Sequence, residues 1–271
     1  MSSYLVTGAS RGLGFEFIRQ LSEDPKNVVV GLVRDKATTD KKVAAEINRH
    51  NIHIVQADLS DYDSLKKTVD VVAPIVNGSL DTIIANAALM GQHSQFEPLG
   101  VVGAKNPQGL EADMLETIKV NVIGNIHLFN LYMPLILKGR TRKIITISSG
   151  MGDVDMAREH KLAISAPYSI SKTAMNAAAV KFHAQYADQG VLFLNICPGV
   201  VNTGIFEPNE EQLRAVMEQE AKFKVYSPRY QGPVTPEESV KDILLQINKA
   251  SLEGGYGGGF ISHLGKGEKW L

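Results

Sequence analysis

The strongest constraint on the fold is a set of short apolar runs that recur along the chain. Residues 28–33, Val-Val-Val-Gly-Leu-Val, are continuously apolar and rich in β-branched residues, as expected of a strand that is buried on both faces. Similar runs lie at 4–6, 52–57, 82–85, 144–147, 191–196 and 260–261. Helical patterns separate them, near 40–49, 62–76, 111–137, 168–189 and 236–249. This alternation predicts an α/β fold with a single Rossmann-type, doubly wound parallel sheet flanked by helices on both faces.

The amino-acid composition limits the classes of function that we expect of the protein. Hydrophobic residues make up 44% and charged residues 21% of 271 residues, with a net charge of −1, so we expect no nucleic-acid partner and no acidic membrane surface. No apolar run approaches the ~18 residues that a spanning helix needs. The single cysteine, Cys197, excludes an internal disulfide and fits a reducing compartment, and the seven histidines form no metal pattern. With a strand predicted from residue 4, no signal peptide fits, and we expect a cytoplasmic protein with one domain over 1–271.

Three stretches lack clear periodicity: 89–110, 150–167 and 203–232. Each follows the end of a predicted strand. Ligands of open α/β sheets bind outside the carboxyl ends of the strands, and long loops there are usually functional. We therefore interpret the three stretches as substrate loops.

A glycine-rich segment follows the first predicted strand and reads Thr7-Gly-Ala-Ser-Arg-Gly-Leu-Gly14. Gly8 permits a tight turn from strand to helix, Gly12 permits close approach of a pyrophosphate, and Gly14 permits close packing of the helix on the strand. The free N–H groups of that helix would face the phosphates. The predicted phosphate-binding residues are Gly8, Ser10, Arg11, Gly12, Leu13 and Gly14. The alternative is a glycine-rich turn without a ligand.

Four further motifs follow the glycine loop in a fixed order. They are Asn86-Ala87-Ala88, Ser149-Gly150-Met151-Gly152, Tyr168-Ser169-Ile170-Ser171-Lys172 and Pro198-Gly199. A second Tyr-x-x-x-Lys match, at 62–66, has no such neighbours. From Thr7 to about residue 205 the ordered set resembles the short-chain dehydrogenase/reductase family in its single-domain form, and most of all its ketoreductase-like or C-factor-like members. The resemblance implies an oxidoreductase with a nicotinamide cofactor.

Reduction of a carbonyl requires hydrogen-bond donors at the oxygen while negative charge develops there. Tyr168 can donate a proton, and Lys172 lies four residues later on the same face of a helix. An ammonium about 5 Å away contributes roughly 3 kcal/mol, so we expect the pKa of Tyr168 to be lowered by about two units. An oxidised nicotinamide, itself cationic, would act in the same direction. By resemblance, Ser149 is the second donor, with Ser148 as the alternative, and Asn121 holds a water that links Lys172 to solvent.

The end of the second strand bears on the choice between NAD and NADP. Position 33 carries no carboxylate, Arg34 follows it, and Arg11 lies in the glycine loop. Arginine binds phosphate through two hydrogen bonds, so we predict NADP(H) in preference to NAD(H). Two alternatives stay open: both arginines could be solvated surface residues, and Asp35 could bind the ribose hydroxyl.

The resemblance also implies the remaining cofactor contacts. Asp58 and Leu59 would meet the adenine, although Asp58 could equally cap a helix or close a turn. The other implied contacts are Asn86, Tyr168, Lys172, Pro198, Gly199, Val201 and Thr203. Ala88 departs from the glycine that is usual in the family's Asn-Ala-Gly.

Together these features predict NADPH-dependent reduction of a ketone, aldehyde or diketone by a cytoplasmic enzyme, without a metal or a membrane partner, and by resemblance a homodimer or homotetramer. Ser149 and Tyr168 are nineteen positions apart. This spacing is longer than is usual in the family, which places 150–167 over the substrate and puts the usual subunit contact near 168–189 in doubt. A partly apolar pocket is predicted from Leu89, Met90, Phe96, Met151, Met156, Phe206, Phe223 and Tyr226. The alternatives are a catalytically silent NADP-binding regulatory protein and, less favoured, a nucleotide-sugar epimerase or dehydratase.

Overall fold

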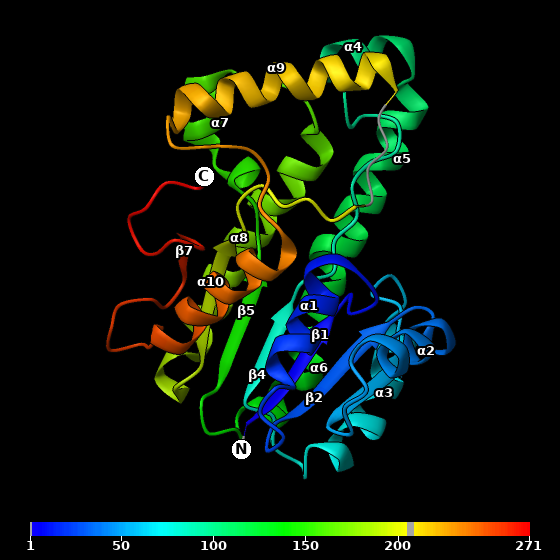
Figure 1. Ribbon diagram of the computed structural model, residues 1–271, viewed down its shortest axis with the longest axis vertical. Coiled ribbons are helices and arrows are strands. Elements are labelled where there is room, and N and C mark those ends of the chain that lie inside the picture. The colour runs from blue at the N-terminus through cyan, green and yellow to red at the C-terminus, as the bar shows by residue number, and fades with distance from the viewer. Residues whose placement is uncertain (1, 205–208) are drawn as a thin grey trace.

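The computed structural model describes residues 2–204 and 209–271 and contains a seven-stranded sheet in the order β3-β2-β1-β4-β5-β6-β7 (Figure 1). Its strands are β1 (Ser3–Thr7), β2 (Val28–Val33), β3 (Ile52–Gln56), β4 (Thr82–Ala85), β5 (Lys143–Ile147), β6 (Leu192–Cys197) and β7 (Gly259–Ser262). All six neighbouring pairs run parallel. The predicted doubly wound parallel sheet is confirmed.

Helices cover both faces of the sheet. One apolar cluster joins one face to α1 (Gly12–Leu21), α2 (Lys36–Glu46) and α10 (Pro236–Lys249). A second joins the other face to α3 (Tyr62–Ile75), α6 (Gly124–Ile136) and α8 (Ala166–Tyr186). Phe129, Phe182 and Phe193 lie at its centre, with ring centroids 5.3 to 5.7 Å apart. The strands read as continuous apolar runs because both of their faces are buried.

The strand order reverses between β1 and β4, and this positions the site. The chain extends from β1 to β3 on one side and from β4 to β7 on the other, so the carboxyl ends of β1 and β4 form the switch point at which ligands of open α/β sheets bind. Val6 pairs with Ile84 in the register of these strands. The segments that follow the two strands, including Gly8 and Asn86, therefore lie side by side.

The three stretches predicted as loops contain helices instead. They hold α4 (Leu99–Lys105), the first residues of α5 (Pro107–Ile118), α7 (Val154–His160) and α9 (Glu210–Tyr226). α9 begins with a capping box at Asn209 and lies across the carboxyl ends of the strands, at the top of Figure 1. The helix expected over 111–137 is divided by a π-helical turn at Lys119–Ile123. These helices lack a clear sequence signal because they are short or weakly amphipathic, and the role of the three stretches at the substrate stays a prediction.

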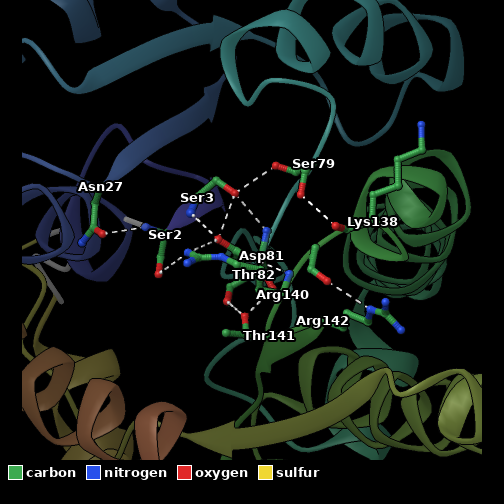
Figure 2. Close-up of polar contacts among 11 residues, drawn as sticks. Ser2, Ser3, Asn27, Ser79, Asp81, Thr82, Lys138, Arg140, Thr141 and Arg142 are labelled. Atoms are coloured by element: carbon green, nitrogen blue, oxygen red, sulfur yellow. Dashed lines mark hydrogen bonds and ion pairs between the residues drawn. The ribbon is translucent and has the colours of Figure 1, made fainter.

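A polar network closes the opposite end of the sheet, where the strands begin (Figure 2). The buried carboxylate of Asp81, just before β4, accepts hydrogen bonds from the N–H of Ser3 (3.0 Å) and of Arg140 (2.8 Å). The guanidinium of Arg140 lies 3.3 Å from it. Burial alone would raise the pKa of Asp81, but the hydrogen bonds from Arg140 and Ser3 and the charge of Arg140 lower it below its ordinary value. The network joins β1, β4 and the turn before β5.

Within 2–204 and 209–271, no helix is long and apolar enough to cross a membrane. The same residues contain no group of three or more His, Cys, Asp or Glu side chains that could hold a metal ion.

Candidate active site

The glycine loop has the geometry of a phosphate cradle. Gly8 and Gly12 have φ angles of +69° and +54°, in the left-handed region that favours glycine. A side chain at Gly14 would collide with the carbonyl oxygen of Gly8. α1 begins here without a side-chain cap and without an acidic residue in its first turn. Its first N–H groups are thus available to an anion, so the loop fits the pyrophosphate of a dinucleotide.

Thr7 and Asn86 join the ends of β1 and β4. The hydroxyl of Thr7 accepts hydrogen bonds from the N–H of Asn86 (3.1 Å) and of Ala87 (3.0 Å). The side-chain amide of Asn86 donates to the carbonyl of Thr7 (3.0 Å). Thr203 reaches the same place, since a Cβ on Gly12 would lie 3.2 Å from its methyl group. The structure therefore brings together three separate parts of the predicted cofactor site.

Near the predicted adenine site, Asp35 and Asp58 both have hydrogen-bond partners within the protein. Asp35 accepts a hydrogen bond from the N–H of Thr38 (3.0 Å) and caps α2, and its hydrogen bonds with Thr38 lower its pKa. Asp58 closes a turn by accepting from the N–H (2.8 Å) and the hydroxyl (2.7 Å) of Ser60. Arg11 and Arg34 are both exposed. The cofactor roles predicted for Asp58, Leu59 and the two arginines stay predictions.

Ser149, Tyr168 and Lys172 converge at the carboxyl end of β5. Ser149 follows β5 directly, whereas Tyr168 lies in the first turn of α8 and Lys172 one turn later. The side chain of Ser149 lies close enough to the hydroxyl of Tyr168 to lower its pKa, and the Ser149 hydroxyl also accepts from the N–H of Met151 (3.1 Å). The ammonium nitrogen of Lys172 donates to the carbonyl of Ile147 (2.7 Å) and lies 5.5 Å from the centre of the Tyr168 ring. The three side chains thus form one cluster.

Ser148 points to the other side of this strand end. Its hydroxyl donates to the side-chain oxygen of Asn176 on α8 (2.6 Å), and the residue is only 2% exposed. Ser149 is partly exposed and faces Tyr168. The geometry therefore places Ser149, and not Ser148, beside the tyrosine.

The pKa values of this cluster differ from the expectation. Burial raises the pKa of Tyr168 to about 12, and the hydrogen bond with Ser149 offsets only part of this effect. Burial also lowers the pKa of Lys172 to about 8. The predicted lowering of the Tyr168 pKa is wrong for the protein's own groups, because desolvation of the phenolate outweighs the attraction that Lys172 was expected to supply.

Asn121 lies in the π-helical turn between α5 and α6. Its side-chain oxygen accepts from the N–H of Leu89 (2.7 Å), and its amide donates to the carbonyl of Leu89 (2.8 Å) and to the hydroxyl of Ser171 (2.9 Å). Asn121 thus fastens the segment after β4 to α8, between Tyr168 and Lys172. The structure reveals this contact with Leu89, which the sequence did not indicate. The predicted water-holding role of Asn121 stays a prediction.

Pro198, Gly199 and Val201 follow β6, and their backbone holds this segment in place. The carbonyl of Pro198 accepts from the hydroxyl of Ser239 (2.8 Å), Gly199 has a φ of +78°, and Val201 forms a β-bridge with Val234. Cys197, at the end of β6, is buried, and its sulfur accepts from the N–H of Gly150 (3.0 Å). Burial raises the pKa of its thiol to about 11, so the thiol is protonated at neutral pH.

An apolar cluster lies on the substrate side. Met156, Phe223 and Tyr230 form its buried centre. Partly buried residues pack around them: Met151, Leu162, Val200, Tyr226, Trp270 and Leu271. Four predicted pocket residues, Met151, Met156, Phe223 and Tyr226, belong to this cluster, and Phe206 lies outside the described residues. No local pattern indicated Trp270 and Leu271, because their contacts depend on the fold of distant segments.

Comparison with known proteins agrees with this geometry. A family model described as short chain dehydrogenase matches residues 3–214. The chain is 51% identical to the short chain dehydrogenase virK of Hypocrea virens and 43% identical to the short-chain dehydrogenase/reductase iacC of Pestalotiopsis fici, with 100% of each chain covered in both cases.

Among solved structures, the carbonyl reductase Sniffer of D. melanogaster superposes with a TM-score of 0.76 at 23% identity, covering 98% of both chains. An NADPH-bound carbonyl reductase from chicken fatty liver superposes with a TM-score of 0.78 at 24% identity, covering 100% of this chain and 94% of that one. At these identities the superpositions concern the fold.

Proposed function

Because the chain belongs to the short-chain dehydrogenase/reductase family of oxidoreductases, we propose that it reduces a ketone, aldehyde or diketone to an alcohol with NADPH. The family resemblance drawn from the five motifs is confirmed by the family model and by the relatives. The observation that carries the proposal is the convergence of Ser149, Tyr168 and Lys172 at the carboxyl end of β5, with the Lys172 ammonium 5.5 Å from the centre of the Tyr168 ring.

In this proposal each residue has a defined task. The bound nicotinamide supplies the hydride. The hydroxyls of Ser149 and Tyr168 donate to the carbonyl oxygen of the substrate as negative charge develops on it. Tyr168, with a pKa of about 12, holds its proton at neutral pH and releases it only to a strongly basic oxygen. Lys172, with a pKa of about 8, is mostly protonated at neutral pH and close enough to the tyrosine to orient it.

The preference for NADPH rests on Arg11 and Arg34. Both guanidinium groups are exposed beside the carboxyl ends of β1 and β2, where a 2′-phosphate would lie. The competing carboxylate of Asp35 is engaged in capping α2. Replacement of both arginines by alanine should raise the dissociation constant for NADPH far more than that for NADH. Equal losses for the two cofactors would contradict the preference.

The substrate in this proposal is largely apolar, because methionine and aromatic side chains gather on that side of the catalytic cluster. The test is consumption of NADPH with a panel of apolar ketones, aldehydes, diketones and quinones, with Tyr168→Phe beside the wild type. Turnover that disappears in the variant is the expected result. Tight NADPH binding without turnover of any carbonyl would favour the alternative, a regulatory NADP-binding protein.

A further inference from the structure

The last three residues of the chain, 269–271, which we call the C-terminal segment, lie on the substrate side of the molecule. In Figure 1 the C-terminus lies beside α7 and below one end of α9. The indole N–H of Trp270 donates to a carboxylate oxygen of Asp153 (2.7 Å), across 117 positions of sequence. The Trp270 ring also stacks on Phe260, with centroids 4.2 Å apart and planes 17° apart. The tryptophan is thus fixed from two directions.

Asp153 connects this tryptophan to α7. One oxygen of its carboxylate accepts the indole N–H, while the other accepts from the N–H groups of Asp155 (2.9 Å) and Met156 (3.1 Å) and caps α7. Asp153 also follows the turn that carries Ser149. A single carboxylate therefore holds both the first turn of α7 and the C-terminal segment.

The same segment fastens the end of α9. The backbone N–H of Trp270 donates to the hydroxyl of Tyr226 (3.1 Å), and the ammonium of Lys269 donates to the carbonyl of Tyr226 (2.7 Å). The hydroxyl of Ser227 donates to the carbonyl of Leu271 (2.9 Å). Phe223 is the one buried residue of α9. Outside the C-terminal segment, the amide of Gln219 donates to the sulfur of Met151 (3.5 Å), and the ammonium of Lys222 donates to the carbonyl of Lys161 (2.8 Å). Elements with few buried apolar contacts open most easily.

Trp270 also lies against residues 149–152, the turn that begins with Ser149 and that we call the catalytic turn. A Cβ built on Gly150 would be 2.9 Å from the Cβ of Trp270, so residue 150 is confined between the tryptophan and Cys197. Ser149 precedes it in the chain. One segment therefore contacts the catalytic turn, α7 and α9 together.

We propose that the C-terminal segment holds α7 and α9 closed over the carbonyl-binding site, with Trp270 as the positioning residue. The inference rests on the proposed function, because it gives the segment a role in binding the same carbonyl substrate. Release of the segment would free α7 and α9 from the catalytic turn. The bound substrate would then lose its apolar cover, while the cofactor, held at the ends of β1 and β4, would keep its contacts.

The experiment compares the full-length wild type with Trp270→Ala, Trp270→Phe and the matched control Leu264→Ala. Leu264 is 48% exposed and lies near the same end of the chain. Trp270→Phe preserves an aromatic ring on Phe260 and removes the five-membered ring of the indole with its N–H. Hydrogen exchange of residues 154–160 and 210–226 measures the opening of α7 and α9 without any need for activity. Substrate KM, kcat and the NADPH dissociation constant are measured in parallel.

We expect exchange in the two helices to be about tenfold faster in Trp270→Phe, the effect of losing one hydrogen bond to a charged group, and faster still in Trp270→Ala. Exchange in the central strands should not change. KM for an apolar carbonyl should rise by a similar factor, while kcat and NADPH binding stay near wild type. Leu264→Ala should behave as the wild type does.

Unchanged exchange in α7 and α9 would overturn the proposal. So would equal acceleration in the strands, which would indicate general destabilisation, or a fall in kcat with KM unchanged. Failure of the wild type to reduce any carbonyl would instead overturn the proposed function, and the exchange data would still decide whether the segment holds the helices. Because Trp270 is the one tryptophan of the chain, its fluorescence in Asp153→Asn reports the same contact directly.

Discussion

An ionisable side chain is buried at each end of the sheet, and the two side chains differ in the partners that surround them. Asp81, at the amino ends of the strands, receives hydrogen bonds from Ser3 and Arg140, and its pKa is lowered. Lys172, at the carboxyl ends, donates to one backbone carbonyl, and burial lowers its pKa toward neutrality. A buried charge that has hydrogen-bond donors and an opposite charge beside it stabilises the fold. A buried charge without a counterion destabilises the fold, and its shifted pKa makes it available for catalysis.

The sharpest test of this comparison is Tyr168→Phe. Loss of the proton donor should lower kcat about 10²–10⁴-fold, the usual contribution of a general acid. The free energy of unfolding should change little, since the variant keeps the aromatic ring and loses only a hydroxyl near Ser149. NADPH oxidation and urea denaturation measure the two effects. A variant that loses stability and keeps its activity would contradict the comparison, because it would show that Tyr168 stabilises the fold and is not needed for the reaction.

The next largest effect is expected for Asp81→Asn. Replacing the carboxylate should lower the free energy of unfolding by about 3 kcal/mol, because the buried donors of Ser3 and Arg140 lose a charged acceptor. Activity per folded molecule should not change. Because the pKa of Asp81 is lowered in the folded state, its contribution is present above pH ~4 and is lost as the pH falls through the folded value. Denaturation at neutral pH and at pH ~3 tests this, with the exposed Asp70→Asn as control.

Lys172→Met should change stability in the opposite direction. Below pH ~8 the folded wild type buries a protonated amine, which costs about 3 kcal/mol, and the variant removes this cost but loses a hydrogen bond to Ile147. We expect a net gain of about 2 kcal/mol at neutral pH together with loss of activity. Since the unfolded lysine titrates near pH ~10.4, the gain should decline between pH ~8 and ~10.4. A gain that is independent of pH would argue against a charged Lys172.

The smallest effect is expected for Arg140→Leu. This guanidinium is 65% exposed, so its attraction to Asp81 is weakened by solvent and should contribute less than about 1 kcal/mol. The backbone N–H of residue 140 still donates to Asp81 in the variant. Denaturation in low and high salt checks the prediction. A loss as large as that of Asp81→Asn would show that the ion pair, and not the hydrogen bonds, stabilises this end.

Much of the fold could be predicted because its strands have an unambiguous signal. The run at 28–33 is apolar throughout and the run at 82–85 is apolar after Thr82, and both form interior strands with buried faces. α9 could not be predicted, because seven of its 17 residues are charged and Phe223 is the one that is buried. The position of this helix depends on contacts with the C-terminal segment, which no local pattern encodes.

The candidate site likewise contains contacts that sequence spacing could predict and contacts that it could not. Tyr168 and Lys172 could be placed together from sequence because four residues of a helix separate them. The contact of Trp270 with Asp153 joins positions 117 residues apart, and that of Ser3 with Asp81 joins positions 78 apart. The pKa of Tyr168 was mispredicted for a related reason: spacing indicates which charges are near, but burial depends on the whole fold.

Cys197 has a consequence for how the protein meets oxidants and alkylating reagents. Its thiol is shielded by the N–H of Gly150, and at neutral pH it carries almost no reactive thiolate. The sulfur also lies 4.0 Å from the carbonyl oxygen of Trp270, so a reagent reaches it when the turn that bears Ser149 or the C-terminal segment moves away. The rate at which this single thiol is labelled therefore reports the opening of this turn and of the C-terminal segment, and a ligand that holds both in place should protect the cysteine from modification.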